Sequence, residues 1–116
     1  MPIVYATPMK DINIIECPRD AMQGITQFIP TKKKIAYINQ LLKVGFSILD
    51  FGSFVSPRSV PQLKDTAEVL NKLDLSVTKT KLLAIVANTI GGKMAAQYDK
   101  ISFLGFPFSI SPTFLK

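Results

Sequence analysis

Apolar residues gather in four short, nearly continuous runs along the chain, at residues 12–16, 46–51, 81–87 and 101–106. Runs of this length are typical of strands that are covered on both faces, as in a parallel sheet. The chain between consecutive runs is long enough for a crossover connection. The pattern therefore predicts alternating strands and helices, with short right-handed crossovers.

The segments between these runs carry apolar residues at helical spacing. Residues 31–44 predict a first helix that ends at Gly45, because glycine is the preferred residue just beyond a helix. A second helix is expected to begin near Ser59 and Pro61, and a short third helix is expected over residues 93–98. The predicted inner faces consist of Ile35, Ile38, Leu41 and Leu42 in the first helix, and of Leu63, Ala67, Leu70 and Leu73 in the second.

Four strands and three intervening helices fit a chain of 116 residues. A complete (β/α)₈ barrel needs about 250 residues. The pattern by itself fits either half of such a barrel or a small open parallel sheet. We treat residues 1–116 as one domain that ends after the fourth strand.

The formal net charge of +6 invites a comparison with nucleic-acid-binding proteins. The basic residues are scattered apart from residues 32–34 and the pair Lys79 and Lys81, and no aromatic residues interleave with them as a base-stacking platform requires. We therefore interpret the lysines as solvated surface and expect no nucleic-acid partner. No apolar run approaches 18 residues, so we expect no membrane partner, and the first residues lack the pattern of a signal peptide.

Two residue types limit the chemistry open to this chain. It contains no histidine, which removes the commonest general base and the commonest transition-metal ligand. Its single cysteine, Cys17, excludes an internal disulfide. We interpret Cys17 as a small buried residue near the end of the first strand.

Arg19 and Asp20 follow the first apolar run at a point where chemistry is common in parallel α/β proteins. Pro18 cannot donate a ladder hydrogen bond, so the strand stops before it and both side chains lie past its carboxyl end. An arginine offers a fixed fork of donors to an anionic oxygen, and a carboxylate can hold a hard divalent cation. The alternative is structural, because Asp after a strand is often a turn or helix-capping residue.

Asp50 is conspicuous because it lies in an otherwise apolar strand. A buried carboxylate needs a partner, and Arg19 is the nearest candidate. Asp50 is therefore expected to orient Arg19, which fits both a structural and a functional interpretation. Asn88 ends the third strand and is expected either to bind substrate or to serve as an ordinary turn or cap.

Two longer motifs occur in a specific order. Residues 15–23 read IECPRDAMQ, and residues 49–62 read LDFGSFVSPRSVPQ. They resemble the first-strand and second-strand motifs of 3-hydroxy-3-methylglutaryl-CoA lyases, and residues 65–70, DTAEVL, look like the second helix of that family. The resemblance runs from about residue 12 to the end of the chain. It implies the N-terminal half of a (β/α)₈ TIM barrel, with α/β class and four parallel strands.

The resemblance also implies roles for individual residues. Arg19 would contact the substrate and stabilise the enolate, Asp20 would bind the divalent cation, magnesium or manganese, and Gln23 would lie beside them. Asp50 stands where the family carries Glu, one methylene longer, and we assign it to the catalytic group with Arg19. The residues assigned to substrate binding are Arg19, Gln23, Ser53 and Asn88.

The implied reaction is the metal-assisted cleavage of 3-hydroxy-3-methylglutaryl-CoA to acetyl-CoA and acetoacetate, as in leucine degradation and ketone-body formation. The family completes its metal site with two histidines and an asparagine, and a cysteine in a late Gly-rich loop assists, all from the second half of the barrel. We therefore expect this chain to be inactive alone and to bind no cation tightly.

Two alternatives stay open. One is another member of the superfamily, such as an isopropylmalate or homocitrate synthase or a hydroxy-keto-acid aldolase. The other is a non-catalytic half-barrel that associates with itself through its bare strand edges. The expected partners are a small acyl-CoA substrate and a second copy in a homo-oligomer, and the expected location is the cytoplasm of a bacterium.

Overall fold

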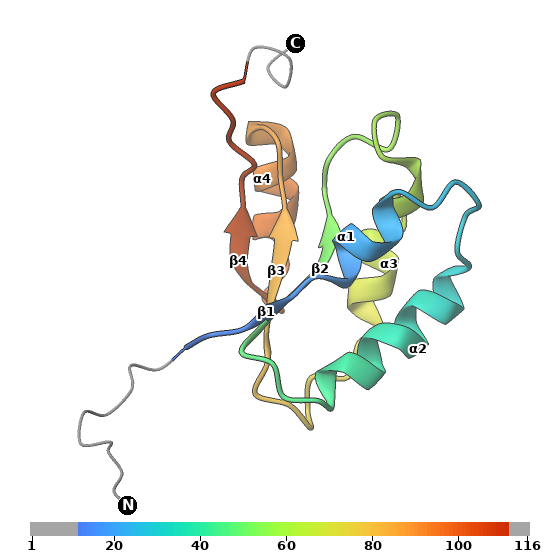
Figure 1. Ribbon diagram of the computed structural model, residues 1–116, viewed down its shortest axis with the longest axis vertical. Helices are drawn as coiled ribbons and strands as arrows, with labels where there is room; N and C mark the ends of the chain where they lie inside the picture. The colour runs from blue at the N-terminus through green and yellow to red at the C-terminus, as the bar shows by residue number, and fades with distance from the viewer. Residues whose placement is uncertain (1–11, 112–116) are drawn as a thin grey trace, which may run out of the picture.

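The computed structural model describes residues 12–111, in which four parallel strands form one sheet. The strand order in space is the order in the chain, β1-β2-β3-β4, so each crossover joins neighbouring strands (Figure 1). This arrangement confirms the predicted fold class. The strands are β1 (Ile15–Glu16), β2 (Ile48–Ser53), β3 (Lys81–Ile85) and β4 (Ile101–Gly105).

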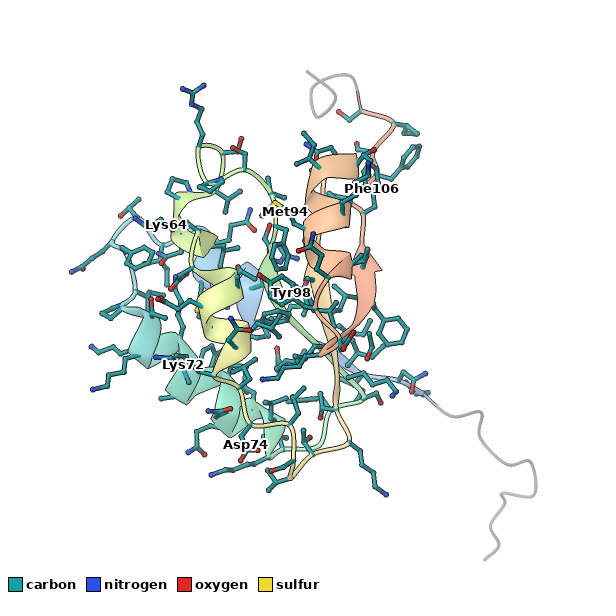
Figure 2. All side chains as sticks on the ribbon, turned by 180° about the vertical axis from the view of Figure 1, so that it is seen from behind. Lys64, Lys72, Asp74, Met94, Tyr98 and Phe106 are labelled. Carbon is teal, nitrogen blue, oxygen red and sulfur yellow. The ribbon has the colours of Figure 1, made fainter. Side chains whose placement is uncertain are left out.

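The helices that connect the strands gather on one face of the sheet. Figures 1 and 2, which view the molecule from opposite sides, show α3 and α4 on this face, and α2 packs against α3. A short helix α1 lies beside the carboxyl ends of β1 and β2. The helices are α1 (Pro18–Gln23), α2 (Thr31–Leu42), the 3₁₀ turn η1 (Pro61–Leu63), α3 (Thr66–Asn71) and α4 (Thr89–Ala96).

The core lies between the sheet and these helices. Alternate residues of β3 point into it, because successive side chains of a strand face opposite sides. The predicted inner face of the first helix is confirmed, with Ile38 and Leu42 in the core and Ile35 and Leu41 packed against it. The prediction for the second helix holds only in part: Leu70 lies in the core, but Leu63 lies in η1, Leu73 lies beyond the helix end, and Val69 is buried where Ala67 was expected. The buried core residues include Ile38, Leu42, Leu49, Phe51, Val69, Leu70, Leu73, Leu82 and Ala84, with Ile35 and Leu41 packed against them.

The other face of the sheet carries apolar side chains that no described helix covers. Phe103 lies in register with Leu83, and Leu83 with Asp50, so the three share this face. Phe103 keeps 41% of its surface exposed and Ile15 keeps 47%. Leu49, in contrast, is fully buried on the helix-covered face.

Several element boundaries differ from those predicted. The second helix begins at Thr66 rather than near Ser59 and Pro61, because Pro61–Leu63 form the separate 3₁₀ turn η1. Residues 18–23, expected as loop, form α1, since Pro18 takes the first helical position, where a missing N–H costs nothing. β1 begins at Ile15 rather than residue 12, because its register pairs span only two residues. α4 begins at Thr89 rather than residue 93, and the cap on its first turn offsets the cost of the Gly91-Gly92 pair.

One lysine of residues 32–34 is not solvated surface, which corrects the expectation for this group. Lys34 keeps only 2% of its surface exposed, and its ammonium pairs with Asp65 Oδ1 at 2.7 Å. It also lies 4.1 Å from the ring centroid of Phe28. Lys32 and Lys33 are exposed, as expected.

The sequence predicts that Gly45 ends the first helix. Gly45 has φ +95°, a conformation that glycine adopts without steric cost. α2 itself ends three residues before Gly45, at Leu42, with Lys43 as its cap. Among residues 12–111, no helix is long and apolar enough to cross a membrane.

Candidate functional site

The candidate site begins where β1 passes directly into α1. Cys17 is the residue before the helix, and Pro18 starts it, so Arg19 and Asp20 lie in the first turn. α1 packs against β2. This placement brings Arg19 next to Asp50, which lies 31 residues further along the chain.

Arg19 and Asp50 form a two-pronged ion pair. Arg19 Nε donates to Asp50 Oδ1 at 3.2 Å, and Nη2 donates to Oδ2 at 2.7 Å. Both side chains are largely buried, with 16% and 6% of their surface exposed. The hydrogen bonds to Asp50 raise the pKa of the Arg19 guanidinium, so the arginine stays charged. The expected pairing of these two residues is therefore present.

Gln23 completes the support of the arginine. Its Oε1 accepts a hydrogen bond from Arg19 Nη1 at 3.0 Å, one helical turn away. A guanidinium has five N–H donors. Three of them serve Asp50 and Gln23, and the other two have no hydrogen-bond partner among residues 12–111.

Asp20 has a different environment. Its carboxylate keeps 77% of its surface exposed and lies 3.5 Å from Arg19 Nη1. The Asp20 carboxylate therefore forms a solvent-exposed salt bridge with the arginine. Within residues 12–111, no three side chains of Asp, Glu, Cys or His gather into a metal-binding group.

Cys17 is partly exposed rather than buried, which corrects the sequence-based interpretation. Cys17 lies between the end of β1 and the start of α1, and its side chain is not part of the core. Burial raises the pKa of its thiol, and the negative charge of Asp50 raises it further. The thiol is therefore protonated at neutral pH.

The bulge in β2 shapes the strand end beyond Asp50. The register with β3 shifts between Asp50 and Gly52, and bulges often occur next to functional sites. A Cβ on Gly52 would lie 2.6 Å from the Thr66 side chain, so only glycine allows this approach. Thr66 Oγ1 in turn accepts the hydrogen bond of Ser53 N–H at 3.1 Å and holds the strand end on α3.

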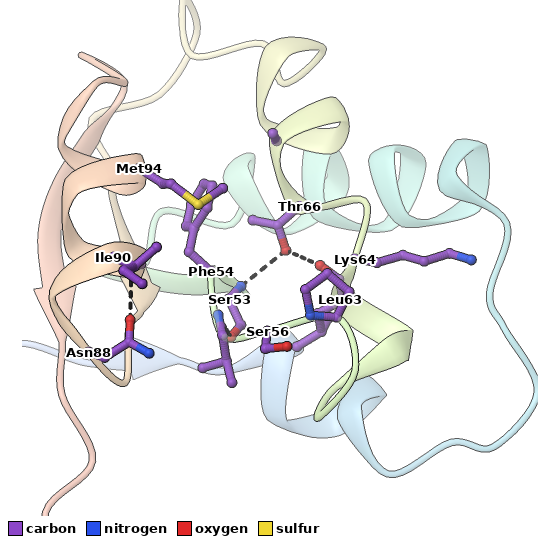
Figure 3. A pocket seen from close by; sticks show the side chains of 13 residues that line it. Ser53, Phe54, Ser56, Leu63, Lys64, Thr66, Asn88, Ile90 and Met94 are labelled. Carbon is purple, nitrogen blue, oxygen red and sulfur yellow. Dashed lines mark hydrogen bonds between the residues drawn. The ribbon is translucent and has the colours of Figure 1, made fainter.

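Ser53 and Asn88 line a cavity of about 320 Å³ between the end of β2, α3 and α4 (Figure 3). Asn88 Oδ1 accepts from Gly91 N–H at 2.9 Å, so Asn88 caps α4, one of its two expected roles. Ser53 Oγ accepts from Val55 N–H at 3.1 Å. Most of the other walls are apolar, and Met94 lies toward Phe54.

A second hollow, of about 330 Å³, lies at the C-terminal end of α1. Its lining consists of Gln23, residues 24–26, Phe28, Pro61 and Gln62. Arg19, Asp20 and Asp50 line neither hollow. The structure thus brings Arg19, Asp20, Gln23 and Asp50 into one cluster, and it places Ser53 and Asn88 together in a separate cavity.

Gln62 is a residue of this region that the sequence interpretation did not assign. Its side chain is buried and bonds to the backbone that follows α1. The available signal was a polar residue next to a predicted helix start. That signal does not identify the partners of Gln62, because they lie more than 30 residues away in the chain.

No protein-family model matches the chain, but individual proteins do. The cytoplasmic 3-hydroxy-3-methylglutaryl-CoA lyase of Rattus norvegicus is 47% identical over 60 residues, which is 51% of this chain and 18% of the rat protein. The hydroxymethylglutaryl-CoA lyase YngG of Bacillus subtilis is 35% identical over 74 residues, which is 64% of this chain and 23% of YngG. The chain thus spans about a fifth of the length of these curated relatives.

Solved structures match over more of the chain. An HMG-CoA lyase from Acinetobacter baumannii, in complex with coenzyme A and 3-methylmalate, superposes with a TM-score of 0.80 and 34% identity over 87% of this chain and 33% of its own. The Bacillus subtilis HMG-CoA lyase gives a TM-score of 0.82 and 33% identity over 91% and 35%. The chain is therefore similar in sequence and fold to hydroxymethylglutaryl-CoA lyases, over about a third of the length of these TIM-barrel enzymes.

Proposed function

We propose that this chain supplies the N-terminal half-barrel of a carbon–carbon lyase that cleaves 3-hydroxy-3-methylglutaryl-CoA to acetyl-CoA and acetoacetate. The observation that carries the proposal is the Arg19 fork, fixed by Asp50 and Gln23 at the carboxyl end of the sheet. The similarity to lyases supports the same reaction.

Arg19 acts by stabilising negative charge that develops on an oxygen. Cleavage of the bond between the hydroxyl-bearing carbon and its neighbour leaves an enolate. Two guanidinium donors that already point in a fixed direction need little reorganisation when that charge appears. Asp50 holds the fork in place, and its pairing lets the arginine be oriented without a ligand.

Asp20 fits a divalent cation as one ligand of several. Its carboxylate is exposed and hard, as magnesium and manganese prefer, while the Asp50 carboxylate is already paired with Arg19. Such a cation, when bound, lowers the cost of charge on the substrate's oxygens. One carboxylate is too few ligands for tight binding. We therefore propose that the remaining ligands come from outside the described residues and that this chain alone gives no turnover.

The proposed substrate partner is an acyl-CoA. A lyase relative has been solved with coenzyme A and 3-methylmalate, which supports this class of ligand for the present chain. The proposed substrate-binding residues are Arg19 and Gln23 of the arginine cluster, together with Ser53 and Asn88 of the separate cavity. A cytoplasmic location and a role in leucine degradation and ketone-body formation are part of the same proposal.

A chimera tests this function directly. Residues 12–111 would replace the matching segment of the Bacillus subtilis lyase, and cleavage of 3-hydroxy-3-methylglutaryl-CoA would be measured with magnesium or manganese. We expect activity in the chimera and a loss of several orders of magnitude in kcat for Arg19→Met, with a smaller effect on KM. Arg58→Met, at an exposed arginine of the β2–α3 loop, is the matched control.

Two outcomes would count against the proposal. A chimera that folds but has no activity would contradict the proposed role of this chain in lyase chemistry. Turnover of Arg19→Met within about tenfold of the parent chimera, roughly 1.4 kcal/mol, would show that Arg19 does not stabilise the transition state. Turnover with another acyl donor instead would favour an isopropylmalate or homocitrate synthase or an aldolase.

The uncovered sheet face supports a second candidate function, a non-catalytic half-barrel that pairs with its own copy. Ile15 and Phe103 are exposed there, and both β1 and β4 have an unpaired edge among the described residues. A second copy related by a two-fold axis would place a β1 edge beside each β4 edge. Self-association without activity in the chimera would favour this candidate.

A further inference from the structure

The backbone that follows α1 has few hydrogen-bond partners of its own. Ile25 N–H donates to Met22 O at 3.0 Å, and the next helix begins at Thr31. Between these points, the backbone groups of residues 25–29 find their described partner in one side chain, that of Gln62.

The side-chain amide of Gln62 forms three hydrogen bonds, all with the backbone of this segment. Its Nε2 donates to Ile25 O at 2.7 Å and to Gln27 O at 3.0 Å. Its Oε1 accepts from Ile29 N–H at 2.9 Å. The residue is 5% exposed, so water does not compete well for these bonds.

Gln62 is itself anchored by a buried ion pair. Lys34 Nζ donates both to the main-chain oxygen of Gln62 and to Asp65 Oδ1. Thr31 Oγ1 donates to the second oxygen, Asp65 Oδ2, at 2.7 Å. The first turn of α2 is thereby tied to the stretch from η1 to the start of α3. Among the described residues, no buried side-chain nitrogen or oxygen of this network lacks a hydrogen-bond partner, which favours one rigid arrangement.

The same region makes direct contact with α1. η1, which contains Gln62, packs against α1, which contains Arg19 and Gln23. The segment that Gln62 holds starts two residues after Gln23. A displacement of this segment would therefore pull on the end of α1 that supports the arginine fork.

We infer that Gln62, anchored by the Lys34–Asp65 pair, is the positioning residue that fixes residues 25–29 and, through them, the Arg19 fork. The importance of Arg19 rests on the proposed function, whereas the position of Arg19 can be read without any activity. Gln62 touches no reacting atom in this role.

The test uses the whole 116-residue chain and hydrogen exchange measured by ¹⁵N NMR. Gln62→Met keeps the length of the side chain and removes all three hydrogen bonds. We expect exchange of the Ile29 amide to become faster by about tenfold or more. We also expect the Arg19 Nε–H signal to shift and to exchange faster, while amides within β3 keep their protection.

A second substitution separates the bonds from one another. Gln62→Glu keeps an acceptor for Ile29 N–H and removes both donors to Ile25 O and Gln27 O. We expect it to protect the Ile29 amide more than Gln62→Met does, yet to loosen residues 25–27. Gln40→Met, at an exposed glutamine of α2, is the control and should change none of these signals.

Each result supports or overturns the inference. If the Ile29 amide of Gln62→Met stays protected from hydrogen exchange, Gln62 does not fix residues 25–29 and the inference is overturned. A freed Ile29 amide with an unchanged Arg19 Nε–H overturns the link to the arginine and leaves Gln62 as a loop anchor. If Gln62→Met does not fold, Gln62→Glu decides through other readouts: unchanged exchange at residues 25–27 overturns the role of Gln62, and an unchanged Arg19 Nε–H signal overturns the link to the arginine. None of these results depends on lyase activity, so a failure here leaves the proposed function to its own test.

Discussion

Arg19 has a different status from an ordinary surface arginine because its direction is set before any ligand arrives. Its side chain is 16% exposed, and its two prongs meet both oxygens of Asp50. Removing one member of such a buried pair leaves the other charge without compensation, which is costly. The consequence is that orientation and stability depend on the same contact.

Asp50→Asn should therefore destabilise the chain. The carboxamide keeps one acceptor for Arg19 but loses the charge, and we expect the free energy of unfolding to fall by about 2–3 kcal/mol. Urea denaturation at a fixed protein concentration measures it. Asp20→Asn is the matched control, with an expected change below about 0.5 kcal/mol, because its carboxylate is 77% exposed. Equal effects of the two substitutions would contradict the pairing as a source of stability.

Cys17 provides a pH-dependent observable at the residue scale. Burial and Asp50 raise its pKa in the folded chain, so the folded state holds the thiol proton to higher pH than the unfolded state does. The stability that this contributes is present below the unfolded pKa and is lost as the pH rises through the folded pKa. We expect alkylation by iodoacetamide at pH 8 to be slower in the folded chain than in urea. Equal rates would contradict the raised pKa.

At the scale of elements, the order of strands and helices follows from the apolar pattern, whereas α1 does not. A helix of six residues is too short to show a periodicity, and Pro18 signalled only where the strand ends. α1 forms because Pro18 suits the first helical position and Met22 finds the core. The sequence could predict the partnership of Arg19 and Asp50, since a charge within an apolar strand needs a partner.

The role of Lys34 could not be predicted in the same way. Lysines at helix starts are ordinarily solvated, and nothing local distinguishes Lys34 from its exposed neighbours Lys32 and Lys33. Its partner Asp65 lies 31 residues away, on the turn before α3. Only the packing of α2 on α3 brings the two together. The cation also faces Phe28, a contact that the loop before α2 makes possible.

Lys34→Met should be strongly destabilising for this reason. The substitution leaves Asp65 buried with Thr31 as its described partner, and we expect a loss of about 3 kcal/mol or more in the free energy of unfolding. Lys33→Met, one residue away and exposed, should change it by less than about 0.5 kcal/mol. The double variant Lys34→Met with Asp65→Leu should recover part of the loss. Additive losses in the double variant would argue against the ion pair.

At the scale of the whole molecule, the sheet has one covered face and one bare face. The covered face holds the core, and the bare face holds Leu83, Ile85 and Phe103 beside the Arg19–Asp50 pair. Soluble monomers rarely expose large apolar patches. The exposed apolar residues include Ile12, Ile14, Ile15, Phe103, Leu104, Phe106, Phe108 and Ile110, and Figure 2 shows Phe106 beyond the end of β4.

We therefore expect the purified 116-residue chain to associate. Each Ile or Leu side chain that becomes fully buried is worth roughly 1.5–3 kcal/mol, so covering several of them favours a dimer or a larger species. Sedimentation equilibrium at micromolar concentration measures this. A single species near 12.8 kDa, without binding of a dye specific for apolar surface, would contradict the expectation and favour a small open sheet that is stable as a monomer.

The two internal ion pairs also determine what the outside of the molecule presents to its surroundings. Arg19–Asp50 and Lys34–Asp65 each neutralise one cation with one anion, so the other 12 basic and 6 acidic residues carry the whole net charge of +6. Two copies that approach one another repel, because these residues comprise twice as many cations as anions. Because added salt shortens the range of that repulsion, to about 3 Å at 1 M, self-association of this chain should grow stronger as ionic strength rises.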